Sequence, residues 1–122
     1  MAEKRTVLVA DDEAHIRMVL TTLLKGMGVF VAGEAGNGES AVEMYRQHRP
    51  DLVLMDVNMP VKTGDAALKE IIAEDPAARV IMLTSMADMA TVEACLKAGA
   101  FNYVRKDSPL DEIRSAVKEA LA

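Results

Sequence analysis

Short apolar segments alternate with amphipathic helical patterns five times along the chain, and this alternation constrains the fold more than any other feature of the sequence. Four segments are almost continuously apolar, at 7–10, 29–32, 52–55 and 80–83, and a weaker fifth lies at 103–104. Unbroken apolar runs of this length are typical of strands that are buried on both faces. The alternation therefore predicts an α/β sandwich, in which a parallel sheet is covered by helices through right-handed crossovers.

The helical patterns lie between the apolar segments. Apolar residues in 16–27 recur with the spacing of one helix face and predict the first helix, and a shorter pattern at 40–48 predicts the second. Patterns that end before Pro76 and Gly99 predict the third and fourth helices. The fifth helix is expected to begin with Ser108 as its N-cap and Pro109 at its first helical position.

Length and composition exclude several classes of protein. A chain of 122 residues has the size of one domain, which we expect to span residues 1–122. Its net charge of −5 gives no overall attraction to nucleic acid, and its single cysteine, Cys95, excludes a disulfide framework and cysteine metal clusters. No apolar stretch approaches the roughly 20 residues that cross a bilayer. We therefore expect a cytoplasmic protein that binds neither nucleic acid nor membrane.

Polar side chains follow the predicted strands at the points where these strands end. The first apolar segment is followed by Asp11 and Asp12, and the third by Asp56. The fourth is followed by Thr84 and the fifth by Lys106. Helix capping is an alternative explanation for each acid singly, but it does not explain the hydroxyl and the ammonium group. Because ligands of open parallel sheets bind at the carboxyl ends of the strands, these side chains predict a site at that edge.

The chemistry of such a cluster is specific. Several neighbouring carboxylates cannot all ionise without a large cost, and a hard divalent ion such as Mg²⁺ relieves their repulsion. A carboxylate beside Mg²⁺ can attack phosphorus and form an aspartyl phosphate. The metal ion and a lysine would neutralise the oxygens of the transferring phosphoryl group, and the Thr84 hydroxyl could donate a hydrogen bond to one of them.

Four motifs resemble the receiver domain of bacterial two-component response regulators over essentially the whole chain. They are VLVADDE at 7–13, DLVLMDVNMP at 51–60, VIMLTS at 80–85 and AGAFNYVRK at 98–106. The resemblance implies a flavodoxin-like (βα)5 fold with a five-stranded parallel sheet in the order 2-1-3-4-5. It also implies a signalling module, and not a turnover enzyme, although such a module assists its own phosphorylation and dephosphorylation.

The resemblance assigns a role to each matching acidic residue. Asp56 would accept a phosphoryl group from a phosphohistidine of a sensor histidine kinase. Asp12 would bind Mg²⁺ directly, and Asp11 would act mainly through water. The backbone carbonyl of Asn58 would complete the protein ligands alongside Asp56.

The same resemblance implies how the signal leaves the site. Thr84 and Lys106 would contact the phosphoryl oxygens, and Tyr103 would turn inward when Thr84 moves toward the phosphate. The surface of the fourth helix, fifth strand and fifth helix would then change and control a downstream protein, a fused output domain or a phosphorylation-dependent homodimer. Asn58 and Met86 would tune hydrolysis, and because an apolar Met86 cannot orient water, we expect slow self-dephosphorylation.

The chain departs from the family pattern after Lys106. A proline, often in a cis bond, usually follows this lysine directly, whereas here Asp107 follows and the proline is Pro109. A cis bond after Lys106 is therefore not expected. The stretch 106–109 resembles receivers of DNA-binding regulators, whereas Asn58 resembles stand-alone chemotaxis receivers, and both interpretations stay open.

Two other functions remain as alternatives. A receiver fold could serve as a scaffold or dimerisation module without phosphorylation, although such a module does not need Asp12, Asp56, Thr84 and Lys106 together. An aspartate-nucleophile phosphohydrolase would use similar groups, but it requires a second acid where this chain has Asn58 and a cap for which the chain has no length.

Overall fold

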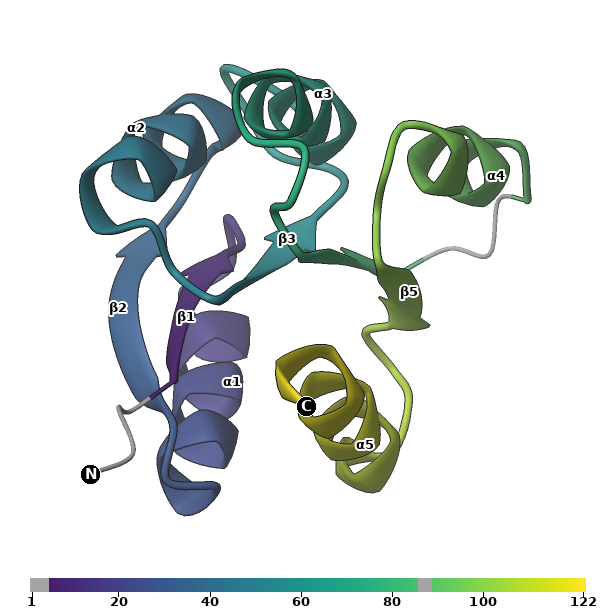
Figure 1. Ribbon diagram of the computed structural model, residues 1–122. Coiled ribbons are helices and arrows are strands. Elements are labelled where there is room, and N and C mark those ends of the chain that lie inside the picture. Colours follow the sequence, from purple (N-terminus) through teal and green to yellow (C-terminus); the bar gives the residue numbers. More distant parts are fainter. Residues whose placement is uncertain (1–4, 86–88) are drawn as a thin grey trace.

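A five-stranded parallel sheet forms the centre of the computed structural model, which describes residues 5–85 and 89–122 (Figure 1). The strands are β1 (Thr6–Ala10), β2 (Phe30–Ala35), β3 (Leu52–Asp56), β4 (Val80–Thr84) and β5 (Asn102–Arg105). The helices are α1 (Ala14–Gly26), α2 (Gly38–His48), α3 (Gly64–Glu74), α4 (Met89–Lys97) and α5 (Leu110–Leu121). The sheet order β2-β1-β3-β4-β5 and the flavodoxin-like architecture confirm the expected fold. Within the described residues, no helix has the length and apolarity needed to cross a membrane.

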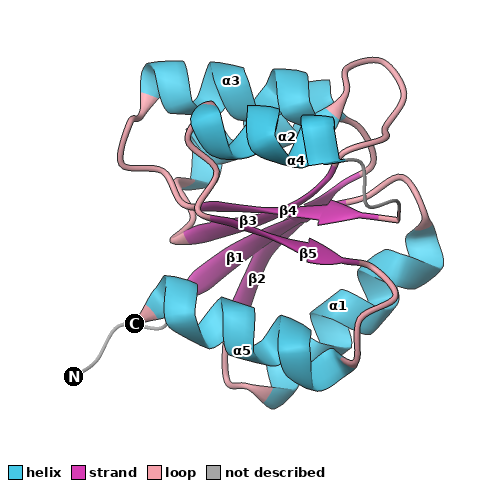
Figure 2. Ribbon diagram, turned by 90° about the vertical axis from the view of Figure 1, so that its right-hand side faces the viewer, coloured by secondary structure: helices cyan, strands magenta, loops and turns pink. Residues whose placement is uncertain are grey.

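Helices cover both faces of the sheet (Figure 2), and β1, β3 and β4 are buried as their continuous apolar runs predict. The apolar run at 29–32 predicted the same for β2, but β2 is partly exposed because it is an edge strand, as is β5. Successive side chains of a strand point to opposite faces, so each strand contributes to two cores. In β1, Leu8 and Ala10 pack into the core under α2, α3 and α4, whereas Val7 and Val9 pack into the core under α1 and α5. Two apolar cores therefore fix the sheet between its helix layers and keep the carboxyl ends of the strands in one row.

Three predicted boundaries differ from the structure. The N-cap of α5 is Pro109, whose extended ψ of 144° keeps it outside the helix, so the prediction of Ser108 as N-cap is wrong. The physical reason is a turn in which the Ser108 N–H donates to the carbonyl of Arg105 and delays the helix. The second helix begins earlier than expected, because Asn37 caps it by accepting a hydrogen bond from the Ser40 N–H at 2.8 Å. The second strand runs three residues further along the sheet than the apolar segment that predicted it.

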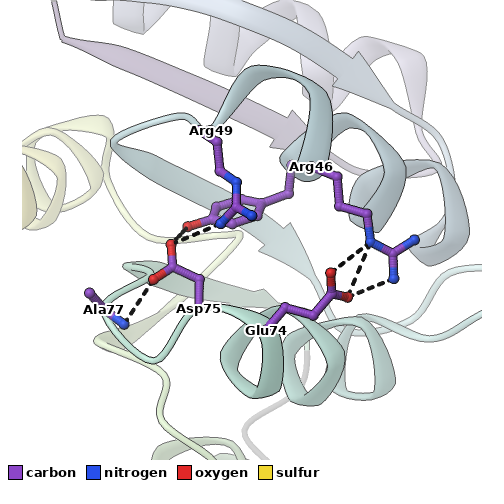
Figure 3. A network of polar contacts seen from close by, with 6 residues as sticks. Arg46, Arg49, Glu74, Asp75 and Ala77 are labelled. Carbon is purple, nitrogen blue, oxygen red and sulfur yellow. Dashed lines mark hydrogen bonds and ion pairs between the residues drawn. The ribbon is translucent and has the colours of Figure 1, made fainter.

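A polar network joins α2 to the C-terminal end of α3 (Figure 3). The Arg46 guanidinium contacts both carboxylate oxygens of Glu74, and Arg49 lies 3.4 Å from Asp75. The Tyr45 hydroxyl donates to Asp75 at 2.6 Å, and burial together with this carboxylate raises the pKa of Tyr45. These contacts hold the two helices together through polar groups at one end of their interface, where the apolar core stops.

Glycine is required where α3 begins directly beside the end of β3. The Gly64 N–H donates to the carbonyl of Val57 at 2.8 Å, and a Cβ atom at Gly64 would lie only 1.8 Å from the carbonyl oxygen of Asp56. No side chain fits into this gap, because the obstructing atom belongs to the backbone. The close approach of α3 to β3 therefore fixes the loop that follows Asp56.

We predict that Gly64→Ala lowers the free energy of unfolding by at least about 2 kcal/mol, because overpacking against a rigid backbone forces α3 away from β3. Gly26→Ala, at the end of α1, is the matched control, since nothing lies within 4 Å of a Cβ atom there. We expect Gly26→Ala to be neutral or to stabilise the protein by up to about 1 kcal/mol. Urea unfolding followed by circular dichroism measures both, and equal effects of the two substitutions would contradict this account.

Candidate functional site

The pairing of the strands brings the predicted site residues to one edge of the sheet. Ala10 pairs with Met55 and Asp56 pairs with Leu83, so the residue after β1, Asp11, lies level with Asp56. Thr84 ends the neighbouring strand β4, one residue beyond the level of Asp56. This register explains why residues that are far apart in the sequence meet at the carboxyl ends of the strands.

Three carboxylates form the centre of the site. Ligand oxygens of Asp11, Asp12 and Asp56 all lie within 4.8 Å of one another. The side chains of Asp11 and Asp56 are almost completely buried, with 0% and 3% exposed, whereas Asp12 is exposed. The cluster therefore combines two buried acids with a third that faces solvent.

Lys106 extends from the end of β5 into this cluster. Its Nζ lies 2.8 Å from Asp11 Oδ2, 3.1 Å from Asp56 Oδ2 and 3.4 Å from Glu13 Oε2. Among the described residues, the Lys106 ammonium is the ion-pair partner of both buried Oδ2 atoms, and neither atom accepts a further hydrogen bond. One ammonium group thus faces three carboxylates, and the buried oxygens retain unused lone pairs.

The electrostatics of the cluster shift the titration of its members. Burial, and then the neighbouring charge of Asp11, raise the pKa of Asp56 from 3.8 to about 6, although Lys106 opposes this shift. Burial disfavours the Lys106 ammonium, but Asp11 and Asp56 outweigh burial and raise the pKa of this lysine. The site is therefore short of positive charge at neutral pH, since one fixed cation faces several acids.

The donor set fits a hard divalent cation. Buried carboxylate oxygens without donors cost free energy unless a cation or a proton binds them. Asp11, Asp12 and Asp56 offer oxygen ligands, and no described residue donates a hydrogen bond to the carbonyl of Asn58, which lies in the loop after β3. An all-oxygen set with an open, solvent-facing side matches the preference of Mg²⁺ for carboxylates plus retained waters.

The backbone around the acids is held by residues that the sequence patterns did not single out. The Arg17 guanidinium donates to the carbonyl of Asp11 at 2.6 Å and pairs with Glu34 at 3.2 Å. Asp11 Oδ1 accepts from the N–H of Glu13 at 2.9 Å, and the Asp11 N–H donates to Ala35. Arg17 is a polar residue outside the apolar stripe of α1, so no pattern in the sequence singled it out.

The remaining predicted residues lie around this centre. Thr84 is buried, and its carbonyl accepts from the Lys106 N–H at 2.8 Å. Tyr103 is half-buried on β5, and Asn58 is exposed. Met86 lies outside the described residues. All peptide bonds of the described residues are trans, including those between Lys106 and Pro109.

Comparison with known proteins decides the family. The sequence model of the response regulator receiver domain family matches residues 7–118 of this chain. The chain belongs to the response regulator receiver domains. Such domains are signalling proteins of two-component systems; they receive phosphoryl groups from histidine kinases, and binding of Mg²⁺ at an acidic pocket is typical of them.

Relatives of this receiver include proteins of different lengths. It is 40% identical to the chemotaxis protein CheY of Bacillus subtilis over 115 residues, which cover 94% of this chain and 96% of that protein. It is also 40% identical to the transcriptional regulatory protein PdtaR of Mycobacterium tuberculosis over 121 residues, but these cover 99% of this chain and only 58% of PdtaR.

A solved structure agrees with this membership. In the complex of CheX, CheY, BeF₃ and Mg²⁺ from Borrelia burgdorferi, the similar chain has a TM-score of 0.93 and 29% identity, with 97% of this receiver and 90% of that chain covered. Both the sequence and the fold of this chain are therefore those of a receiver domain.

We predict that Asp56→Asn stabilises the metal-free receiver at neutral pH. The Asp56 carboxyl loses its proton near pH 4 in the unfolded chain but near pH 6 in the folded one, so its ionisation destabilises the fold as the pH rises between these values. The destabilisation that Asn removes is up to about 3 kcal/mol above pH 7 and vanishes near pH 4. Urea unfolding in EDTA at several pH values measures this difference.

Asp107→Asn is the control, because this carboxylate is exposed in the turn after β5, where it pairs with Arg105. We expect a change within about 1 kcal/mol that does not grow with pH. A gain in stability for Asp56→Asn that is independent of pH would contradict the electrostatic explanation.

Proposed function

We propose that this receiver is a phosphorylation-controlled switch in which Asp56 accepts a phosphoryl group from a sensor histidine kinase. The observation that carries the proposal is the position of Lys106, whose ammonium group extends from the end of β5 to lie 3.1 Å from a buried oxygen of Asp56. A nucleophile with an unshared lone pair and an adjacent fixed cation is what phosphoryl transfer to a carboxylate requires.

The transfer assigns a task to each residue. The ionised Asp56 carboxylate attacks phosphorus, the bond from phosphorus to the histidine nitrogen breaks, and the electron pair leaves with the imidazole. The Lys106 ammonium, which already faces Asp56, balances the charge on the phosphoryl oxygens. The Thr84 hydroxyl, at the end of the neighbouring strand, donates a hydrogen bond to one of them.

Mg²⁺ would be held by Asp12, Asp56 and the carbonyl of Asn58, with Asp11 acting mainly through water. When bound, the ion neutralises the acids and the charge that develops on the phosphoryl group. Arg17 keeps the carbonyl of Asp11 in place at 2.6 Å and thereby fixes the loop that carries the acids.

The phosphorylated state is read at a distance from Asp56. Thr84 lies on β4, and Tyr103 lies on the adjacent strand β5, where Met82 pairs with Tyr103. A shift of Thr84 toward the phosphoryl group leaves space into which Tyr103 turns, and the surface formed by α4, β5 and α5 changes with it. We infer that this surface controls a downstream protein, a fused output domain or a homodimer.

The same proposal includes the extent of the domain, its cellular location and its partners. We infer that residues 1–122 act as one receiver domain in the cytoplasm, without direct contact with nucleic acid or membrane. The domain assists its own phosphorylation and dephosphorylation, but it is not an enzyme that turns over a separate substrate. Similarity to CheY supports a separate protein partner, and similarity to PdtaR supports an output domain in the same chain.

We predict that acetyl phosphate transfers one phosphoryl group to this protein only when both Mg²⁺ and Asp56 are present. Intact-mass spectrometry before and after incubation detects the added group directly. Asp56→Asn is expected to abolish the gain in mass, and Lys106→Met to reduce its rate by at least about tenfold, because the fixed cation beside the nucleophile is lost. Asp107→Asn removes an exposed acid next to Lys106, so it is the matched control and is expected to react normally.

The outcomes separate the proposed switch from its alternatives. Folded protein that gains no phosphoryl group with Mg²⁺ would favour a constitutive scaffold or dimerisation module. Continuous release of phosphate from many donor molecules, without a stable gain in mass, would favour a phosphohydrolase. The decay of the phosphorylated mass also tests the expectation from Met86 that hydrolysis is slow.

A further inference from the structure

Glu13 is the third carboxylate beside Lys106, and neither the binding of Mg²⁺ nor the proposed attack on phosphorus uses it. Its Oε2 lies 3.4 Å from the Lys106 Nζ, although 93 positions separate the two residues in the chain. The same Nζ lies 3.1 Å from Asp56 Oδ2, so one ammonium group connects Glu13 to the nucleophile. Glu13 therefore lies close enough to Asp56 for its charge to act on a group that reacts there.

Helix capping does not explain the position of the Glu13 side chain. Glu13 is the N-cap residue of α1, but its side chain makes no capping hydrogen bond, and glutamate is not a preferred N-cap residue. Asp11 and Asp12 already place negative charge at this end of α1, where it interacts favourably with the helix dipole. The Glu13 carboxylate thus extends toward Lys106 and not toward the first turn of its own helix.

The backbone of Glu13 is held by hydrogen bonds on both sides of the residue. Its N–H donates to Asp11 Oδ1 at 2.9 Å, and its carbonyl accepts from the N–H groups of Ile16 and Arg17, both at 3.1 Å. The side chain therefore starts from a fixed point in the turn between β1 and α1. A fixed starting point and a short side chain keep the negative charge of Glu13 beside Lys106.

The exposure of the side chains increases from the nucleophile outward. The side chain of Asp56 is 4% exposed, that of Lys106 is 12% exposed and that of Glu13 is 50% exposed. Glu13 therefore lies on the solvent side of Lys106, from which a phosphodonor must approach the buried Asp56. In phosphoryl transfer the attacking and leaving atoms lie roughly in line, with phosphorus between them. The leaving group is consequently on the side away from Asp56, which is the side of Glu13.

Among the described residues, Lys106 is the only cation that pairs with Glu13. Lys106 is itself shared with the two buried acids, at 2.8 Å and 3.1 Å. Arg105, the residue before Lys106, is already paired with Asp107, with both nitrogen–oxygen distances at 3.1 Å. The negative charge of Glu13 is therefore only partly compensated and acts on an approaching donor.

We propose that Glu13 determines which phosphodonors this receiver accepts, by the charge of their leaving group. Its carboxylate repels a donor whose leaving group is an anion, as in an acyl phosphate. It tolerates a donor whose phosphorus-bound nitrogen is protonated, as in a phosphoramidate, because attraction to the nitrogen offsets repulsion of the phosphoryl oxygens. This inference rests on the proposed function, because it concerns the donor from which Asp56 accepts the phosphoryl group.

The two kinds of donor differ in how charge moves as the bond to phosphorus breaks. In both reactions an Asp56 oxygen forms the new bond to phosphorus. From acetyl phosphate, the phosphorus–oxygen bond breaks and its electron pair leaves with acetate, so negative charge grows on the side of Glu13. From phosphoramidate, the phosphorus–nitrogen bond breaks and its electron pair neutralises the protonated nitrogen, which leaves as ammonia. Glu13 therefore opposes the first reaction more strongly than the second.

The rates of phosphorylation by acetyl phosphate and by phosphoramidate, followed by intact mass with Mg²⁺ present, test the proposal. We expect Glu13→Gln to raise the rate with acetyl phosphate by about threefold to fivefold and to change that with phosphoramidate by less than about twofold, as for the loss of one exposed charge. High salt is expected to reduce this difference between the donors. Glu13→Asp keeps the charge and is expected to preserve the ratio of the two rates. Asp107→Asn removes an acid that pairs with Arg105, so it is the matched control and is expected to leave the ratio unchanged.

The ratio of the two rates separates selection by charge from structural damage, which slows both donors alike. An unchanged ratio in Glu13→Gln would overturn the proposal, and so would an equal change of the ratio in Asp107→Asn. The affinity for Mn²⁺, measured by broadening of amide resonances, is expected to change by less than about twofold in Glu13→Gln, and a larger loss would assign the effect to the ion and overturn the proposal. Wild-type protein that gains no phosphoryl group from either donor would reject the proposed function together with this inference. A normal gain with an unchanged ratio in the variant would reject the inference alone.

Discussion

The repulsion between two buried carboxylates, Asp11 and Asp56, is the interaction on which the rest of the site depends. Their charges would destabilise the fold if they were not balanced, and Lys106, from a strand two places away from β3, supplies a single fixed cation within 3.1 Å of both. One ammonium group does not neutralise the cluster. The cluster therefore favours a further positive charge, and a divalent cation would relieve the repulsion.

The sheet provides the rigidity that this arrangement needs. The three central strands, β1, β3 and β4, are buried between two apolar cores, so their ends cannot separate to relieve the repulsion of the acids. Gly64 lets α3 approach Asp56, and Arg17 fixes the carbonyl of Asp11, so the acids are held from both sides. Tyr103 lies on the edge strand β5 and Lys106 follows directly after this strand, so one segment connects the charged site to the outer side of the molecule.

The sequence predicted the fold and the residues of the site better than it predicted the side-chain contacts and the exact ends of the helices. Apolar runs indicated the strands, and family motifs supplied the strand order, so Asp11, Asp56 and Lys106 could be expected at one edge. The contacts of Lys106 with Glu13, and of Arg17 with the Asp11 carbonyl, depend on side-chain reach and register between distant segments, for which a pattern of residues has no signal. The start of α5 was misplaced for a similar reason, because a backbone turn at Ser108 outweighs the preference of serine for the N-cap.

The central claim is that these acids form one cation-dependent centre, and paramagnetic broadening by Mn²⁺ tests it most directly. Mn²⁺ accepts the same oxygen ligands as Mg²⁺, and substoichiometric amounts broaden only the amide resonances close to the bound ion. The account predicts broadening centred on 11–13 and 56–58, reversed by excess Mg²⁺ and lost in Asp12→Asn. Broadening spread over the exposed carboxylates of other helices, or unchanged in Asp12→Asn, would contradict it.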